Sequence, residues 1–146
     1  MIIIPFETVK VDTLMDSPVF VNEEDNILTV IKRLLQTAKG YVLVNRSNKT
    51  VGIISDRDIQ RLILEKGGMF SPTINAKDFM VTPVIMCEKS LSLYEAEALM
   101  QRKKVNRLPV VEKEGSKVVI GIINFDTVHS NLLSNFAKSW IKRKQQ

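Results

Sequence analysis

Residues 14–21 read Leu-Met-Asp-Ser-Pro-Val-Phe-Val, and residues 79–86 read Phe-Met-Val-Thr-Pro-Val-Ile-Met. When the chain is shifted by 65 positions, the Met, Pro and Val of the two stretches coincide and Ser faces Thr. Self-similarity at a fixed period is the signature of a repeated architecture, so this chain is predicted to hold two copies of one unit. The same shift pairs five further positions: Glu23 with Glu88, Leu28 with Leu93, Leu34 with Leu99, Gln36 with Gln101 and Lys39 with Lys104.

Each half predicts the same order of elements, which is an extended segment, a helix, two strands and a second helix. Apolar residues follow the extended segment at helical spacing in both halves. Ser92, with Glu95 three residues later, predicts a capping box at the start of the helix in the second half. The paired strands are expected over 41–44 and 51–55 and over 108–111 and 118–124, and the closing helices over 56–65 and from 126 to about 143.

These elements predict the fold class α/β (α+β), as two β-α-β-β-α repeats packed sheet to sheet about a pseudo-two-fold axis, with an extended C-terminal helix. A unit of about 60 residues is only marginally stable alone, so the halves are expected to pack together. Clefts between such halves are where ligands preferentially bind. The expected boundaries are a lead-in over 1–10, repeats over 11–66 and 76–133, a linker over 67–75, and a C-terminal helix extension and basic tail over 134–146.

The composition is that of a globular protein, with 45% hydrophobic and 25% charged residues among 146. The apolar runs are strand-sized, so no membrane insertion is expected. The start of the chain does not read as a secretory signal. One cysteine, Cys87, cannot form an internal disulfide, which agrees with a cytoplasmic location. The net charge of +5 is concentrated near the C-terminus, where it suits a helix end, so nucleic acid is not expected as a partner.

The sequence offers no catalytic constellation. Metal sites and nucleophilic triads need several His, Cys or carboxylate groups in register, and His129 is the only histidine. The six glycines give neither the P-loop spacing nor the dinucleotide-binding spacing. The chain is therefore predicted not to be an enzyme and to have no metal and no cofactor.

At this point the sequence resembles the CBS-domain family over about residues 11–135. The resemblance is carried by the two Met-x-x-Pro-Val openings, by Asn106-Arg107-Leu108-Pro109-Val110-Val111 and by Gly52-Ile53-Ile54-Ser55-Asp56-Arg57-Asp58. The last stretch looks like the family's ribose-phosphate motif. The resemblance implies a stand-alone pair of repeats, or Bateman module, which binds AMP, ATP, related adenosyl compounds or cyclic dinucleotides and is often a dimer.

For the first repeat, the resemblance implies a ribose-phosphate site at Ser55, Arg57 and Asp58. An aspartate at a helix start can accept charge-assisted hydrogen bonds from ribose hydroxyls, and the helix dipole favours phosphate beside Ser55. The base slot is expected to be lined by Pro18, Val19, Val42 and Ile54, with backbone groups near Val19 reading the base edge. The alternative is that Ser55 is only an N-cap and Asp56 a first-turn acid.

The second repeat departs from the motif, because Asn124 replaces Ser or Thr, Asp126 comes one residue early and Thr127 stands at the Asp position. Ribose binding is therefore doubtful there, although a basic and apolar lining remains. The candidate residues of this second site are Pro83, Val84, Lys104, Arg107, Leu108, Pro109, Asn124, Asp126 and Thr127.

The function predicted from the sequence is a regulatory module that senses AMP, ADP, ATP or another adenosyl compound, such as cyclic di-AMP, NAD or S-adenosylmethionine, and relays this to a partner protein. The alternative is a ligand-independent module for protein–protein assembly. The preferred ligand, the number of filled clefts and the regulated partner stay open. A homodimer is also expected, because the last helix carries two apolar rows: Val128, Leu132, Phe136 and Trp140, and beside them Leu133, Ala137 and Ile141.

Overall fold

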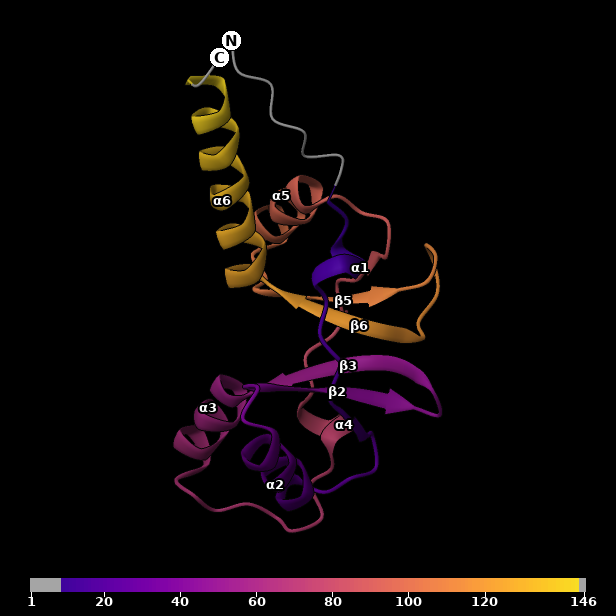
Figure 1. Ribbon diagram of the computed structural model, residues 1–146. Coiled ribbons are helices and arrows are strands. Elements are labelled where there is room, and N and C mark those ends of the chain that lie inside the picture. The colour runs from indigo at the N-terminus through magenta and orange to yellow at the C-terminus, as the bar shows by residue number, and fades with distance from the viewer. Residues whose placement is uncertain (1–8, 145–146) are drawn as a thin grey trace. The chain divides into compact units, whose positions relative to one another are not determined.

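The computed structural model describes residues 9–144, with side chains to residue 141. The chain forms two compact units (Figure 1). One, here called the middle unit, is Pro18–Val84, and the other, the terminal unit, combines Met1–Ser17 with Ile85–Gln146. The predicted lead-in over 1–10 and the end of the predicted tail fall largely outside the described residues.

The middle unit is a three-stranded sheet with helices, in the order β1 (Phe20–Asn22), α2 (Ile27–Thr37), β2 (Tyr41–Arg46), β3 (Lys49–Ser55), α3 (Asp56–Lys66) and α4 (Ala76–Phe79). Strand β1 pairs with β2 in parallel, and β2 pairs with β3 antiparallel. Asn26 caps α2, which buries Ile27, Val30 and Leu34 at helical spacing. Gly67, in the left-handed region at φ 60°, ends α3 at the predicted linker.

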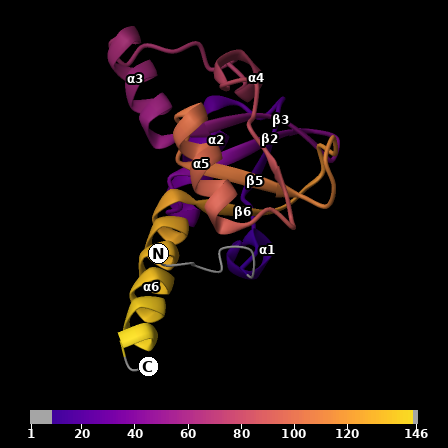
Figure 2. The same ribbon diagram turned by 90° about the horizontal axis from the view of Figure 1, so that it is seen from above.

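The terminal unit repeats the order strand, helix, strand, strand, helix, but its one-turn helix comes first instead of last. Its elements are α1 (Val11–Leu14), β4 (Cys87–Glu88), α5 (Leu93–Lys103), β5 (Arg107–Val111), β6 (Val119–Asn124) and α6 (Phe125–Lys144). Its sheet is again parallel at the first pair and antiparallel at the second. The first turns of α6 bury Val128 and Leu132 in the core of this unit. The last turns of α6 extend beyond α5 (Figures 1 and 2). No described helix is long and apolar enough to span a membrane.

The predicted β-α-β-β-α order is thus confirmed twice, as is the long C-terminal helix. The cap of α5 is one-sided rather than a full box. The Ser92 hydroxyl accepts from the Glu95 N–H at 3.1 Å, but the Glu95 carboxylate accepts from that same hydroxyl and not from the Ser92 N–H. The reciprocal half of the predicted capping box is therefore absent at this helix start.

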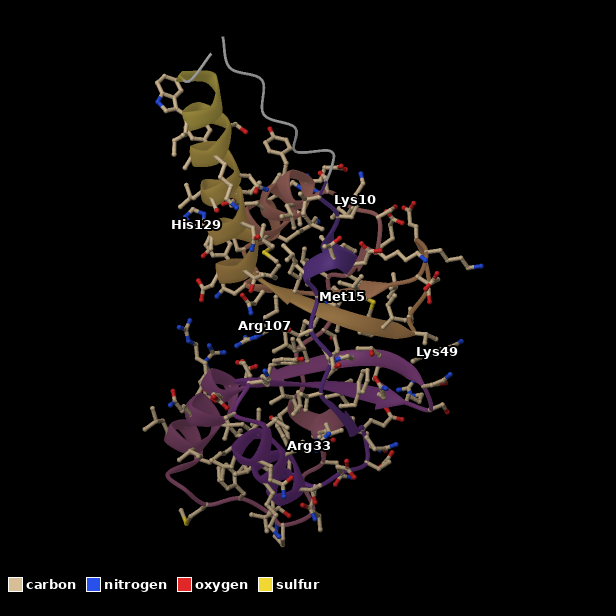
Figure 3. All side chains as sticks on the ribbon, viewed as in Figure 1. Lys10, Met15, Arg33, Lys49, Arg107 and His129 are labelled. Carbon is tan, nitrogen blue, oxygen red and sulfur yellow. The ribbon has the colours of Figure 1, made fainter. Side chains whose placement is uncertain are left out.

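Each unit is closed by the opening turn of the other sequence repeat. In the terminal unit, the Asp16 and Ile122 backbones exchange hydrogen bonds of 2.8 and 2.9 Å, and Met15 lies over Gly121 on β6 (Figure 3). In the middle unit, Ile53 and Val81 exchange the matching bonds, and Met80 lies over Gly52. Each compact unit therefore contains the strands and long helices of one sequence repeat and the opening turn of the other.

The structure corrects the pairing of residues inside the repeats. Strand partners make Val21 equivalent to Cys87, because Val21 faces Val44 and Cys87 faces Val110, and both partners face the glycine of the third strand. From Val21 to Val44, each residue of the first repeat is therefore equivalent to the residue 66 positions later. The predicted pairing of Leu28 with Leu93 is therefore wrong, because Leu28 is 60% exposed and Leu93 is 1% exposed. The true helix equivalents are Ile27 with Leu93, Val30 with Ala96 and Leu34 with Met100, all buried.

Candidate functional site

The strand-to-helix junction of the middle unit holds a hydroxyl and a carboxylate in a full capping box. Ser55 ends β3 and is the N-cap of α3. Its Oγ accepts from the Asp58 N–H at 3.2 Å, while the Asp58 Oδ2 accepts from the Ser55 N–H at 2.8 Å and from the Ser55 hydroxyl at 2.9 Å. The alternative interpretation of Ser55 as an N-cap is therefore correct as local structure, and the acid that completes the cap is Asp58, whereas Asp56 is exposed.

This arrangement still leaves chemistry for a ligand. The second carboxylate oxygen of Asp58, Oδ1, lies 4.0 Å from Nη1 of Arg61, at the limit of an ion pair, and the Asp58 side chain is 19% exposed. Oδ1 can accept hydrogen bonds from the hydroxyls of a sugar. A phosphate at the helix N-terminus can replace Asp58 as the acceptor of the hydrogen bond that the Ser55 hydroxyl donates. Arg57 is exposed one residue before Asp58. The structure thus brings Ser55 and Asp58 together, and Arg57 lies beside them in the first turn of α3.

The predicted base-slot residues lie at the same end of the sheet. Val42 and Ile54 are strand partners, adjacent to the pair Tyr41 and Ser55. Both are fully buried, and Val19 is 7% exposed. Their side chains therefore belong to the core, and of the four predicted slot residues Pro18 keeps the most surface.

The backbone of Val19 is already engaged. Its carbonyl accepts from the Leu43 N–H at 2.7 Å, and its N–H donates to the Tyr41 hydroxyl at 3.3 Å. Tyr41, 4% exposed, is a residue that the sequence analysis missed at this site. The available signal was an aromatic side chain at the first position of β2, next to the Ser55 end of β3. The equivalent position in the terminal unit is Arg107, which faces Asn124.

The corresponding junction of the terminal unit is built from different groups. Asn124 ends β6, and its Oδ1 accepts from the Thr127 N–H at 2.8 Å. Thr127 stands where Asp58 stands in α3, so no carboxylate returns to the start of α6. The Thr127 carbonyl instead accepts from the Asn131 side chain at 2.8 Å. Asp126 is exposed beside this cap.

The other predicted residues of the second site are only partly gathered. Leu108 and Pro109 are buried in β5, and Arg107 at the start of that strand is half-buried (Figure 3). Lys104 is exposed and ends α5 in the left-handed region at φ 56°. Pro83 and Val84 close the middle unit and so belong to the other body.

Metal and nucleophilic chemistry find little support in the described residues. Within 9–144, no three His, Cys, Asp or Glu side chains form a possible metal site. Burial raises the pKa of the Cys87 thiol to about 12, which keeps it protonated at neutral pH. His129 on α6 lies 2.9 Å from a Glu97 carboxylate oxygen and stacks on Phe125, so it joins α5 to α6 (Figure 3).

A family model for the CBS domain matches residues 10–65 and 76–133. The chain belongs to the CBS-domain family. The matched ranges follow the sequence repeats and include both strand-to-helix junctions. A protein of Methanopyrus kandleri is 34% identical over 87 residues, which are 60% of this chain and 43% of that protein. This chain therefore aligns with less than half the length of that relative.

Solved structures of CBS-domain pairs share the fold. One, described in complex with 5′-methylthioadenosine and S-adenosyl-L-methionine, has a TM-score of 0.71 at 19% identity and covers 92% of this chain and 98% of its own. Another, CBSX2 in complex with AMP, has a TM-score of 0.67 at 24% identity and covers 86% and 97%. At these identities, the likeness establishes the fold of a tandem CBS pair.

Proposed function

We propose that this chain is a regulatory module that binds an adenine nucleotide or adenosyl compound at the β3–α3 junction. The observation that carries the proposal is the pairing of Ser55 with Asp58 at the N-terminus of an 11-residue helix. One helix start thereby offers a carboxylate for ribose hydroxyls and a hydroxyl with backbone N–H groups for phosphate. The candidate ligands are AMP, ADP, ATP, cyclic di-AMP, NAD and S-adenosylmethionine.

Two CBS pairs of the same fold support the adenosyl class, since one is described with AMP and the other with S-adenosylmethionine and 5′-methylthioadenosine. Their common chemical part is an adenine on a ribose. The ribose is what a carboxylate such as Asp58 recognises, whereas the groups beyond the 5′ carbon differ. We therefore assign ribose recognition to Asp58 and the choice among ligands to Ser55, Arg57 and the residues around them.

In this proposal, binding is not followed by a reaction. The junction supplies a hydroxyl, a carboxylate and a guanidinium, and a serine whose proton is held by an aspartate without an imidazole is not an activated nucleophile. The module acts in the cytoplasm, as a homodimer, and passes the state of its site to a partner protein.

The second candidate is a ligand-independent assembly module. One observation favours it, which is that Ser55 and Asp58 already satisfy each other in the capping box. The fold of this junction is complete without a ligand, so an assembly role would need nothing more from these residues.

A thermal-shift panel of the six candidate ligands separates the two functions. A ligand at about 100 times its dissociation constant stabilises the folded chain by about 2.7 kcal/mol, which raises Tm measurably. We expect at least one adenosyl ligand to raise Tm in the parent chain and to raise it much less in Asp58→Asn, which keeps the shape of the side chain and removes its charge. Unchanged Tm with all six ligands at millimolar concentration would favour the assembly module.

A further inference from the structure

One face of α6 is exposed over the part of the helix whose side chains are described, up to Ile141. Val128 and Leu132 are buried at 0% and 8% exposure, but the neighbouring positions on the other side of the helix open to solvent. The exposed apolar side chains are Leu133 at 58%, Phe136 at 46%, Trp140 at 44% and Ile141 at 56%. The first predicted row is therefore split, because Val128 and Leu132 build the terminal unit whereas Phe136 and Trp140 lie on its surface. The second row, Leu133, Ala137 and Ile141, is exposed throughout.

The exposed residues recur at a coiled-coil spacing. Leu133 and Trp140 are seven residues apart, with Phe136 and Ala137 between them, so all four lie on one side of the helix. Ala137, also exposed, stands at the middle of the apolar stretch that runs from Leu133 to Ile141. A small residue flanked by large ones allows two helix axes to approach closely at that point.

The charges along α6 are ordered from one end to the other. Asp126 lies in the first turn, and the sequence has no acidic residue after it. Every charged residue that follows is basic: Lys138, Lys142, Arg143 and Lys144. Two such helices side by side in parallel would bring the basic ends of both sequences together. An antiparallel pair keeps these basic ends apart and places each near the half of the partner helix that begins with Asp126. The two helix dipoles then point in opposite directions, which is favourable.

We propose that the exposed face of α6 pairs with the same face of a second copy of this chain, antiparallel, with the two-fold axis at Ala137. Leu133 of each copy then contacts Ile141 of the other, as a self-complementary interface requires. Phe136 and Trp140 flank Ala137 and leave water. This surface goes beyond the nucleotide proposal and specifies the homodimer, which can exist through another surface if this one is wrong.

Cysteine cross-linking of the full chain tests both the face and its direction. In the antiparallel pair, an equal mixture of Leu133→Cys and Ile141→Cys should form a mixed disulfide under mild oxidation. Each variant alone should not, because residues 133 of the two copies lie about 12 Å apart along the axis, at 1.5 Å per residue, whereas a disulfide spans about 4.4 to 6.8 Å between Cα atoms. Ala137→Cys should link to itself.

Two controls frame this experiment. Lys138 is exposed, but it lies about 140° around the helix from Leu133 and about 100° from Ala137, so Lys138→Cys should not cross-link. The parent chain is the blank, since its single cysteine, Cys87, is buried. Disulfides within Leu133→Cys alone and Ile141→Cys alone would mean a parallel pair and overturn the proposed direction. The absence of cross-links in every variant would overturn the surface.

Light scattering distinguishes the surface from the homodimer itself. We expect Leu133→Glu to shift the full chain from dimer to monomer at micromolar concentration, with an unchanged circular-dichroism spectrum at 25 °C, while Lys138→Glu remains a dimer. If the parent chain is a dimer and Leu133→Glu is a dimer too, the homodimer is supported and the exposed face of α6 is not its interface. A parent monomer that floats with vesicles of anionic phospholipid would assign the face to a lipid surface instead and reject both.

Discussion

The β3–α3 and β6–α6 junctions do the same structural task with different side chains. Ser55 and Asp58 form a reciprocal cap, whereas Asn124 caps Thr127 from one side only. The second junction begins a 20-residue helix without any carboxylate at the position of Asp58. A helix start of this fold therefore does not require an acid there, and the carboxylate of Asp58 is available to serve a ligand as well as the cap.

Asp58→Ala should have the strongest effect on ligand binding. We expect adenosyl binding to weaken by about 1.5 to 3 kcal/mol, the usual worth of a hydrogen bond to a charged group. This corresponds to about a 10- to 150-fold rise in Kd. Isothermal titration calorimetry with the best ligand of the panel measures it, and circular dichroism checks the fold.

The matched change at the other junction is Asp126→Ala, on an exposed acid one residue before Thr127. If calorimetry finds that Asp126→Ala abolishes binding while Asp58→Ala binds like the parent, the assignment of the site to the first repeat is reversed. Asn124→Ser combined with Thr127→Asp is the reverse test, since it supplies the missing hydroxyl and carboxylate to the second junction.

A smaller effect concerns the feature that the two units share, the methionine that lies over a glycine. A Cβ on Gly52 would lie 2.3 Å from Sδ of Met80, closer than real contacts allow. We expect Gly52→Ala to lower the free energy of unfolding by about 1 to 3 kcal/mol through overpacking. Met80→Ala should couple with it in a double-mutant cycle measured by urea unfolding, because the two residues touch.

The control for this cycle is Met15→Ala, since Met15 lies over Gly121 in the other unit. Gly52→Ala and Met15→Ala should be additive within experimental error. Coupling of Gly52 with Met15 in place of Met80 would contradict the exchange of opening turns between the repeats.

The exchange itself was beyond the sequence pattern. Periodicity and capping residues are local signals, and they correctly predicted every strand and helix longer than one turn. The contact of Met80 with Gly52 links positions 28 residues apart, and nothing in the spacing distinguishes it from a contact within the same repeat. The domain boundaries read from the repeat therefore follow the chain, whereas compactness follows the packing.

Identical residue types also gave the wrong equivalence inside the helices. A shift of 65 matched Leu28 with Leu93, but burial selects Ile27 as the equivalent of Leu93. The second repeat has one residue more than the first between its opening Met80 and Cys87. This segment contains no helix, so helical spacing gives no sign of the insertion. At the candidate site, Ser55 and Asp58 were predicted because residues 52–58 resemble the ribose-phosphate motif of the family. Tyr41 lies outside that motif, and a single buried aromatic side chain gives no signal of its own.

The corrected equivalence reveals an ion pair whose charges are reversed between the units. Glu23 binds Arg46 at 2.8 Å in the middle unit. The equivalent positions in the terminal unit are Lys89 and Glu112, which also form an ion pair. The hydrogen bond to Arg46 lowers the pKa of Glu23, and the hydrogen bond to Glu112 raises the pKa of Lys89. The Glu23 side chain is 12% exposed, but Arg46, Lys89 and Glu112 are exposed. Ion pairs near the surface contribute little, so these two should give the smallest effect.

The two pairs should separate at alkaline pH. Lys89 has a raised pKa, so its contribution is complete below its ordinary value of 10.5 and is lost as pH rises through the higher folded value. Arg46, whose pKa is raised from 12.5, stays charged over that range. We expect Lys89→Gln and Glu23→Gln each to lower Tm slightly at pH 8. As the pH rises above about 10.5, the difference in Tm from the parent should close for Lys89→Gln and persist for Glu23→Gln.

On the acid side, the pKa of Glu23 is lowered from its ordinary value of 4.5. The difference in Tm between Glu23→Gln and the parent should therefore close only as the pH falls below 4.5. Differences that close together at high pH would show that the reversed charges do not titrate independently in the two units.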